Sequence, residues 1–234
     1  MEAASRECAS VIEYRIGSQL VRIRVNRKVY MPSVATILLA RNLREVKGLD
    51  VLDLGTGSGI LAILASKLGA RRVVATDISR RAISAAIDNA RLNGVDNIEF
   101  RLGSLYEPVR GEVFDLIICN PPMTPSPKPL PRYTWGGFDG RRVLEPVVKE
   151  ARFYLRDGGR LLIPVISLIG IGWAYRLMLS SGLKPRAIDY TVHPFGKRLL
   201  ELKDYLDSLP ASEYVYDRLG RPCWRIVLFE AARI

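Results

Sequence analysis

The sequence has little of what metal, disulfide or membrane proteins use. It contains three cysteines and one histidine among 234 residues. An odd, sparse set of cysteines does not predict a disulfide framework, and no Cys/His cluster has the spacing of a zinc site. The first residues lack the apolar core of a signal peptide. The longest uncharged stretch, Leu161–Tyr175, is shorter than the ~20 residues of a membrane span. We expect a protein of the reducing cytoplasm, without a metal or a membrane partner.

Acidic residues are also in short supply. The 24 Asp and Glu are outnumbered by 35 Lys and Arg, which gives a net charge of +11. An excess of this size favours a polyanionic partner such as RNA or DNA. It is equally typical of an arginine-rich, solvated surface with ion pairs suited to high temperature. The cations are scattered along the chain without a basic run, so composition alone leaves both interpretations open.

What the sequence does contain is a regular alternation of strands and helices. Residues 11–30 alternate apolar and polar side chains around Gly17, which predicts a β-hairpin or an extended arm. We expect residues 1–30 to be an N-terminal extension and residues 31–234 to be one domain. In that domain, short apolar strands between helices predict a mainly parallel sheet covered on both faces. The expected strands are 51–54, 72–76, 97–102, 114–119, 160–164, 184–192 and 224–230, and the expected helices are 34–46, 60–68, 80–92, 141–155 and 171–181. A turn is expected at Gly158-Gly159.

A glycine-rich turn follows the first strand of this domain. Residues 51–60 read Val-Leu-Asp-Leu-Gly-Thr-Gly-Ser-Gly-Ile, with Asp53 near the end of the strand. Glycine permits positive φ and a close approach of the backbone to a ligand, and open α/β sheets bind ligands at the carboxyl ends of strands. Three alternate glycines exceed what a strand-to-helix turn requires, so the pattern predicts a nucleotide-type ligand. Asp53 suits a ligand that carries an ammonium group rather than a pyrophosphate.

The common phosphate-binding fingerprints do not fit this turn. The dinucleotide pattern G-x-G-x-x-G would need glycine where Ile60 stands, and the P-loop pattern is absent. Asp77 ends the second strand, where a carboxylate can accept both hydroxyls of a ribose. Ile78 can lie against an adenine ring, and Ser79 is expected to cap the next helix.

Asn120-Pro121-Pro122-Met123 directly follows another apolar strand. Two prolines cannot extend that strand, and they leave carbonyl oxygens unpaired. The amide oxygen of Asn120 and a nearby carbonyl oxygen can together hold an NH2 group. The nitrogen lone pair is then aimed at an electrophile without a charged base. The irregular stretch 121–140 is long for a compact domain, which indicates a functional loop. Cys119 and His193 have no partners near them in sequence, and we expect them to have no catalytic role.

Together these motifs resemble the class I S-adenosylmethionine (SAM)-dependent methyltransferases, in particular N-methyltransferases with an N/D-P-P-aromatic motif. The resemblance covers about residues 28–165. It implies a Rossmann-like sandwich with a mostly parallel, seven-stranded sheet, and SAM as the cofactor. It implies catalysis by Asn120 and Pro121, and substrate binding by Pro122 and Met123. The residues implied in cofactor binding are Asp53, Gly55, Thr56, Gly57, Gly59, Asp77, Ile78, Ser104, Leu105 and Asn120.

Two further segments are similar to HemK-like glutamine methyltransferases. Residues 29–33 (Val-Tyr-Met-Pro-Ser) and Thr36 resemble the segment before their SAM domain. Residues 135–141 (W-G-G-F-D-G-R) resemble the W-x-G-G-x-D-G-R segment of their short archaeal and eukaryotic branch. The resemblance implies methylation of a glutamine amide nitrogen in translation release factors. Ala35, Ser104 and Met123 depart from the family pattern, which usually has acidic residues at the first two positions and an aromatic residue at the third.

Other acceptors stay open at this point. The same chemistry can act on the amino group of an RNA or DNA base, adenine N6 or guanine N2, if the base is single-stranded or flipped. The net charge of +11 favours this alternative, although a release factor also works beside RNA. A third interpretation is a non-catalytic RNA-binding module with a SAM-type fold. A NAD-dependent oxidoreductase is disfavoured by Ile60. No motif predicts the oligomeric state or the role of the last third of the chain.

Overall fold

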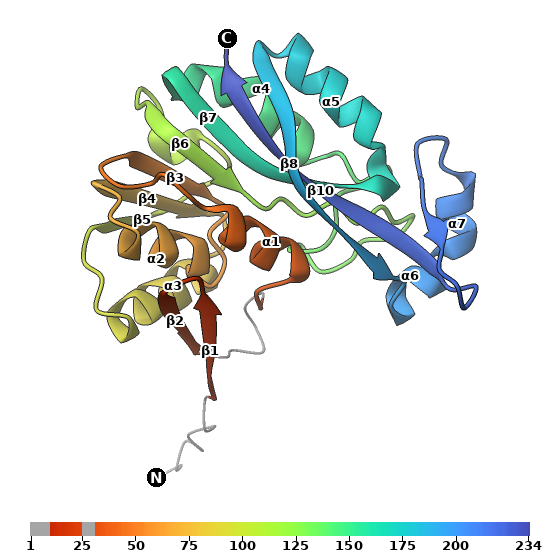
Figure 1. Ribbon diagram of the computed structural model, residues 1–234, viewed down its shortest axis with the longest axis horizontal. Helices are drawn as coiled ribbons and strands as arrows, with labels where there is room; N and C mark the ends of the chain where they lie inside the picture. The colour runs from red at the N-terminus through yellow and green to blue at the C-terminus, as the bar shows by residue number, and fades with distance from the viewer. Residues whose placement is uncertain (1–9, 25–30) are drawn as a thin grey trace.

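The computed structural model describes residues 10–24 and 31–234. Its centre is a β-sheet flanked by helices, and an N-terminal hairpin lies beside it (Figure 1). The strands are β1 (Val11–Ile16), β2 (Gln19–Arg24), β3 (Asp50–Leu54), β4 (Arg72–Asp77), β5 (Ile98–Leu102), β6 (Phe114–Cys119), β7 (Leu155–Ile166), β8 (Leu183–Pro194), β9 (Val215–Tyr216) and β10 (Pro222–Arg233). The helices are α1 (Val34–Asn42), α2 (Ile60–Lys67), α3 (Arg80–Leu92), α4 (Leu144–Tyr154), α5 (Ile171–Ser180), α6 (Lys197–Glu201) and α7 (Lys203–Ser208), with 3-10 turns η1 (Glu107–Val109) and η2 (Ser167–Ile169).

The sheet runs in the order β5-β4-β3-β6-β7-β10-β8, and the short β9 pairs with β10. The strands from β5 to β7 are parallel neighbours, whereas β10 is antiparallel to both β7 and β8. The expected mostly parallel sheet is therefore confirmed. Strand order reverses between β3 and β6, and at such a point the carboxyl ends of neighbouring strands leave a crevice for a ligand.

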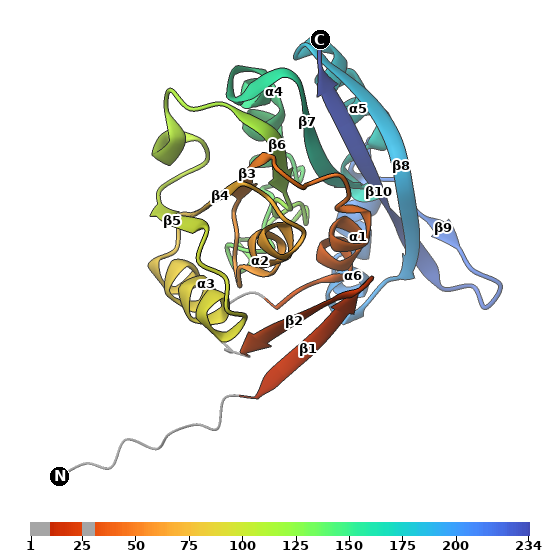
Figure 2. The ribbon, with the colours of Figure 1, turned by 60° about the vertical axis from the view of Figure 1, so that its left-hand side comes forward.

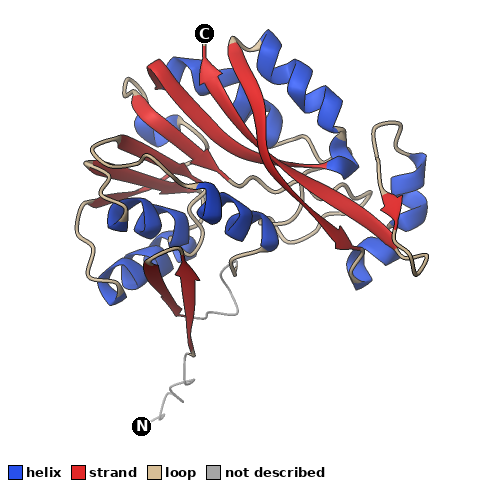
Figure 3. Ribbon diagram, viewed as in Figure 1, coloured by secondary structure: helices blue, strands red, loops and turns tan. Residues whose placement is uncertain are grey.

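Helices cover both faces of the sheet (Figures 2 and 3). The first three, α1 to α3, pack on one face, and α4 and α5 pack on the other. The central strands are correspondingly buried: all five residues of β3 and five of the six residues of β6 are inaccessible or nearly so. Burial on both faces is the physical reason why these strands have no polar alternation in the sequence.

The β1–β2 hairpin packs on α2 and α3 (Figure 1). Val21 and Ile23 are fully buried and belong to the same core as the sheet. Asn93 exchanges two hydrogen bonds with the backbone of Arg22, at 2.9 and 2.6 Å, and Asn89 Oδ1 accepts from the Arg24 amide at 2.9 Å. The expected hairpin is thus found over residues 11–24. The rest of the predicted segment, residues 25–30, lies outside the described residues.

Some expected elements differ from the structure. Gly158 and Gly159 lie inside the continuous strand β7, where a register shift against β6 replaces the predicted turn. The helix expected over 34–46 ends at Asn42, because Leu43 is extended and Glu45 has φ 52°. The short helices α6 and α7 were not predicted. They bury almost nothing, so the sequence shows no apolar stripe there.

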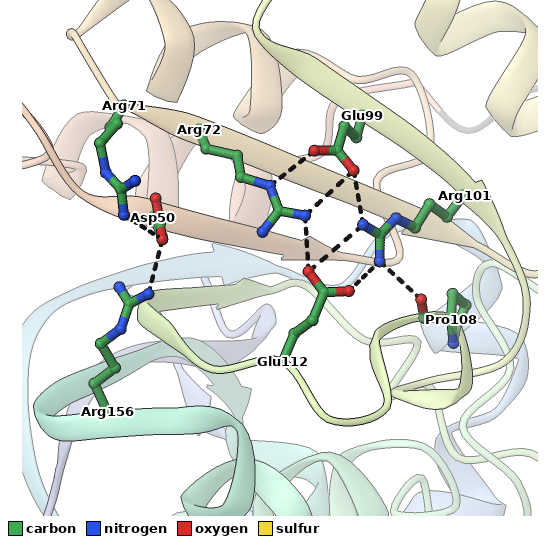
Figure 4. Close-up of polar contacts among 8 residues, drawn as sticks. All are labelled: Asp50, Arg71, Arg72, Glu99, Arg101, Pro108, Glu112 and Arg156. Atoms are coloured by element: carbon green, nitrogen blue, oxygen red, sulfur yellow. Dashed lines mark hydrogen bonds and ion pairs between the residues drawn. The ribbon is translucent and has the colours of Figure 1, made fainter.

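Ion pairs link the first residues of β3 and β4 to neighbouring elements (Figure 4). Oδ2 of Asp50 accepts from Arg71 at 2.6 Å and from Arg156 at 2.8 Å. A second group consists of two arginines, Arg72 and Arg101, and two glutamates. Each arginine forms ion pairs with both Glu99 and Glu112. Hydrogen bonds from these arginines, Arg72 first, lower the pKa of Glu99 to about 2. These four arginines therefore serve the fold. The carboxylates that they pair with are already subtracted in the net charge of +11, so the pairs do not account for the positive excess.

Candidate active site

A cavity of about 900 Å³ opens at the carboxyl ends of β3, β4 and β6, beside the point where strand order reverses. It brings together motifs that are far apart in the sequence. The predicted site residues that line it are Gly55, Gly57, Asp77, Ile78, Ser104, Leu105, Asn120, Pro121, Pro122 and Met123. The predicted residues Asp53, Thr56 and Gly59 are not part of its lining.

The glycine turn presents its backbone to the cavity. Gly55 and Gly57 have φ of 80° and 56°, values that residues with a side chain rarely adopt. A Cβ atom at either position would meet nothing within 4 Å. The Gly55 and Thr56 amides donate to the Thr76 carbonyl at 2.9 and 2.8 Å, and the Gly57 amide donates to Asp77 Oδ2 at 3.0 Å. The turn is therefore held by β4, while the space beside its glycines stays open for a ligand.

Asp77 ends β4, and the backbone engages both of its carboxylate oxygens. Oδ2 accepts from the Gly57 amide at 3.0 Å, and Oδ1 accepts from the Ser79 amide at 2.8 Å. Each oxygen keeps a further lone pair, so the carboxylate can still accept hydroxyl groups. Ile78 is 50% exposed at the cavity and offers apolar surface. Ser79 caps α3 as predicted, because its side chain accepts from the Ala82 amide.

Asp53 stabilises the glycine turn from inside the fold, away from the cavity. Its side chain is almost fully buried, and Oδ2 accepts from Thr56 Oγ1 at 2.6 Å and from the Ala62 amide at 3.1 Å. Burial, more than the nearby charge of Asp77, raises the pKa of Asp53 to about 6. This position ties the glycine turn to α2 and does not place the carboxylate at the cavity surface, where contact with an ammonium group was expected.

The side chain of Asn120 is oriented by α1. Its Nδ2 donates to Thr36 Oγ1 at 3.0 Å, and the same oxygen accepts from the Ser33 amide at 3.1 Å. Ser33 and Thr36 form a capping box at the start of α1. Because Nδ2 is committed to Thr36, the amide oxygen is the group left for the cavity. Sequence reasoning did not give Thr36 a role at the site.

The segment 135–141 folds back on the Asn-Pro-Pro-Met element. Thr124 and Trp135 form a parallel bridge, and the Gly136 amide donates to the Thr124 carbonyl at 3.0 Å. Gly140 passes so close that an added Cβ would lie 2.4 Å from the Met123 carbonyl oxygen. Only glycine fits there. The segment therefore holds the proline-rich loop in place, and Met123 is fixed as a nearly buried wall of the cavity.

Sequence reasoning missed the far wall of the cavity. Ile166 at the end of β7, Trp224 on β10, and Arg132 and Arg142 also line it. No local motif marks Ile166 and Trp224, since they meet the cavity only through the pairing of distant strands. Arg132 lies on the stretch 121–140, which was expected to be functional, and Arg142 follows it closely, but no role was predicted for either residue. Cys119 also borders the cavity, but burial raises the pKa of its thiol far above the usual range, so it stays protonated.

In the described part of the chain, no group of three or more His, Cys, Asp or Glu side chains can hold a metal ion. No helix among those residues is long and apolar enough to cross a bilayer.

Several methyltransferases are similar to this chain in sequence. Residues 36–121 match the family model described as ribosomal protein L11 methyltransferase. A Methanocaldococcus jannaschii protein, provisionally named a protein N5-glutamine methyltransferase, is 38% identical over 156 residues, which are 64% of this chain and 78% of the relative. The ribosomal protein L11 methyltransferase of Lactobacillus johnsonii is 52% identical over 84 residues. That match covers 36% of this chain and 26% of the relative, so the chain spans about a quarter of that enzyme.

A solved structure shares the fold. The 16S rRNA N2 methyltransferase of T. thermophilus, determined with S-adenosylmethionine and guanosine, has a TM-score of 0.63 and 19% sequence identity, covering 96% of this chain and 50% of that one. The chain belongs to the class I SAM-dependent methyltransferases. It is a methyltransferase that uses SAM, and its Rossmann-like fold and cofactor agree with the sequence-based expectation.

Proposed function

We propose that this enzyme methylates the side-chain amide nitrogen of a glutamine in a protein, and that a translation release factor is the acceptor. The observation that carries the proposal is the Asn120 amide, whose nitrogen is taken by Thr36 so that its oxygen is left for the cavity. The 38% identity to the M. jannaschii relative supports a glutamine acceptor. The segments 29–33 and 135–141 support the HemK-like branch.

The residues at the glycine turn fit SAM as the ligand. In this proposal Asp77 accepts the ribose hydroxyls through the lone pairs that the backbone leaves free, and Ile78 and Leu105 adjoin the adenine. When bound, SAM supplies a methyl group that its sulfonium already activates. The remaining proposed contacts come from the backbone of the turn and of the second residue after β5: Gly55, Gly57 and Ser104. Three residues act through the shape of the turn: Asp53, Thr56 and Gly59.

The chain's task in the reaction is alignment. Asn120 Oδ1 and the Pro121 carbonyl accept the two hydrogens of the acceptor NH2 group, which leaves the nitrogen lone pair directed at the methyl carbon. The nitrogen–carbon bond forms as the carbon–sulfur bond breaks, and one N–H proton is then released. Pro122 and Met123 wall the pocket and exclude water. Such orientation can account for several powers of ten in rate.

Asn120→Ala is the direct test of this role. We expect methyl transfer to fall by about three powers of ten, because the acceptor nitrogen is no longer oriented. SAM affinity, measured by calorimetry, should change less than about threefold, since the ribose and adenine contacts lie elsewhere. Asp77→Ala is the matched control and should weaken SAM binding instead. Unchanged turnover in Asn120→Ala would refute the role.

The acceptor is tested with tritiated SAM and purified release factor, ribosomal protein L11, tRNA and rRNA. We expect label in the release factor, on a glutamine located by mass spectrometry. A base amino group is the second candidate, favoured by the net charge of +11 and by Arg132 and Arg142 at the cavity. Label in RNA alone would overturn the glutamine proposal.

A further inference from the structure

The cavity has a second end beyond Asn120. In the sheet order, β3, β4 and β5 lie on one side of β6, and β7 and β10 lie on the other. The glycine turn, Asp77 and Leu105 belong to the first side, which is the proposed SAM end. Ile166 and Trp224 line the cavity from the second side. Asn120, at the end of β6, therefore stands between the cofactor and an acceptor end.

Strand geometry directs Trp224 into that acceptor end. Ile226 on β10 pairs with Ile166 on β7, so the two side chains share a face of the sheet. Trp224 is two residues from Ile226 and shares that face, because side chains alternate along a strand. β10 lies two strands from β6, at about 4.8 Å per strand, so an indole can span much of the gap toward Asn120.

The indole is held in place from the other side. Trp224 pairs in register with His193 on β8, and the two ring centroids lie 6.1 Å apart. His193 Nε2 is hydrogen-bonded to Thr191 Oγ1 at 3.0 Å, which fixes the imidazole in turn. Trp224 packs on the core and is only partly buried, so it keeps an aromatic surface in the cavity. Because the ring is already fixed, little side-chain entropy is lost when a ligand binds against it.

The wall around Asn120 lacks such a surface. Pro121, Pro122 and Met123 are apolar but have no π face, whereas the proposed acceptor amide is planar. Tyr133 is the other aromatic side chain of the lining, but it is half exposed and lies on the proline-rich loop. We propose that Trp224 is the stacking surface for the planar acceptor group, and that it is a specificity-determining residue of this site. The inference builds on the proposed glutamine acceptor.

Two substitutions separate stacking from apolar bulk in the full-length protein. Trp224→Phe keeps an aromatic face, and Trp224→Leu keeps apolar volume without one. Release-factor binding is measured by calorimetry with S-adenosylhomocysteine present, and KM and kcat are measured with tritiated SAM. We expect Trp224→Leu to weaken release-factor binding about tenfold, in line with aromatic pair energies, and Trp224→Phe to stay within about twofold of wild type. SAM affinity should be unchanged in both variants.

Tyr190→Leu is the matched control. Tyr190 lies on β8 opposite Val227, on the other face of the sheet, and is not part of the cavity lining. We expect no change in acceptor binding from this substitution. Equal acceptor affinities of the Leu and Phe variants would overturn the inference, and so would a loss of SAM affinity confined to Trp224→Leu.

Failure of the proposed function gives a different result. If wild type labels RNA and not the release factor, the glutamine proposal fails. The Phe and Leu variants compared on that RNA then still decide the role of Trp224. If wild type binds and labels neither acceptor, both proposals fail.

Discussion

Hydrogen bonds decide which polar side chains around the cavity are available to a ligand. Asp53 and Asn120 both lie at the ends of apolar strands, so from sequence alone each is a candidate for direct contact. In the structure Asp53 accepts from Thr56 and Ala62 below the turn, whereas Asn120 lines the cavity. The direction of the Asn120 amide depends on Thr36, which is 84 residues away. No local pattern can predict that contact.

The buried carboxyl of Asp53 predicts a pH dependence of stability. Its pKa is about 6 in the folded chain against an ordinary value of 3.8, because burial disfavours the charged form. Folding therefore takes up a proton between these two pH values. As pH rises through this window the folded state loses about 3 kcal/mol relative to a protein without the group. This loss of stability begins at pH ~4 and is complete above pH ~6.5.

Asp53→Asn isolates this effect. Urea unfolding of both proteins at pH 4 and pH 7.5 should show the variant gaining about 3 kcal/mol on wild type as pH rises. Changes from all other groups cancel in the comparison, because they are common to both proteins. A constant difference between the two proteins across this range would contradict the burial of the charge.

At the scale of elements, the N-terminal hairpin and the glycine turn are linked through α3. Asn89 is buried, accepts from the Arg24 amide of β2, and donates from Nδ2 to the Ser58 carbonyl in the turn at 2.8 Å. Val21 and Ile23 place the hairpin in the common core. We therefore propose that the sequence boundary between residues 1–30 and 31–234 does not separate two folding units.

Asn89→Ala should remove both hydrogen bonds that link the hairpin to the glycine turn. We expect a loss of about 2 kcal/mol in the free energy of unfolding, because the Arg24 amide and the Ser58 carbonyl are left unpaired. SAM affinity should fall several-fold as the turn loosens, measured by calorimetry. Asn93→Ala is the control, because Asn93 contacts the hairpin but not the turn. It should lower stability and leave SAM affinity unchanged; equal SAM affinities in both variants would refute the link.

The predictability of the elements follows from their burial. The strands β3, β4 and β6 are predictable because they are short apolar runs between helices, which is the pattern of strands buried on both faces. Gly158 and Gly159 were misinterpreted as a turn, since their place inside β7 depends on pairing with β6. The helices α6 and α7 escape prediction because almost all of their residues stay partly or fully exposed.

At the scale of the whole molecule, the arginine side chains have at least two uses. Arg71, Arg72, Arg101 and Arg156 pair with carboxylates inside the fold. Arg132 and Arg142 instead line the cavity, where they can meet an anionic part of the acceptor. Because the carboxylates of these ion pairs are already subtracted in the net charge of +11, the positive excess belongs to the other Lys and Arg side chains, including those at the cavity.

The salt dependence of acceptor turnover measures how much this positive charge contributes to acceptor binding. With release factor as acceptor, we expect kcat/KM to fall less than about tenfold between 50 and 200 mM KCl, because few charges are neutralised. An RNA acceptor with six or more phosphate contacts would lose about a thousandfold over the same range. SAM affinity at both salt concentrations is the control. A steep loss with release factor would show that its recognition is mainly electrostatic.

The sequence by itself determined the class of this protein, because the glycine-rich turn and the Asn-Pro-Pro-Met element are each an unbroken run of residues. Each of them also follows an apolar strand, and the carboxyl ends of these parallel strands meet at the same edge of the sheet. It also determined which residues form those motifs. Only the tertiary structure decided which of their atoms face the cavity: Asp53 points beneath the turn, and Thr36 turns the Asn120 amide. It alone brought Trp224 to the cavity. The Asn120 and Trp224 outcomes depend on contacts between elements that are distant in sequence, which no local pattern of residues encodes. The partners of Asp53 are only 3 and 9 residues away, but burial of its carboxylate depends on the packing of the sheet and α2.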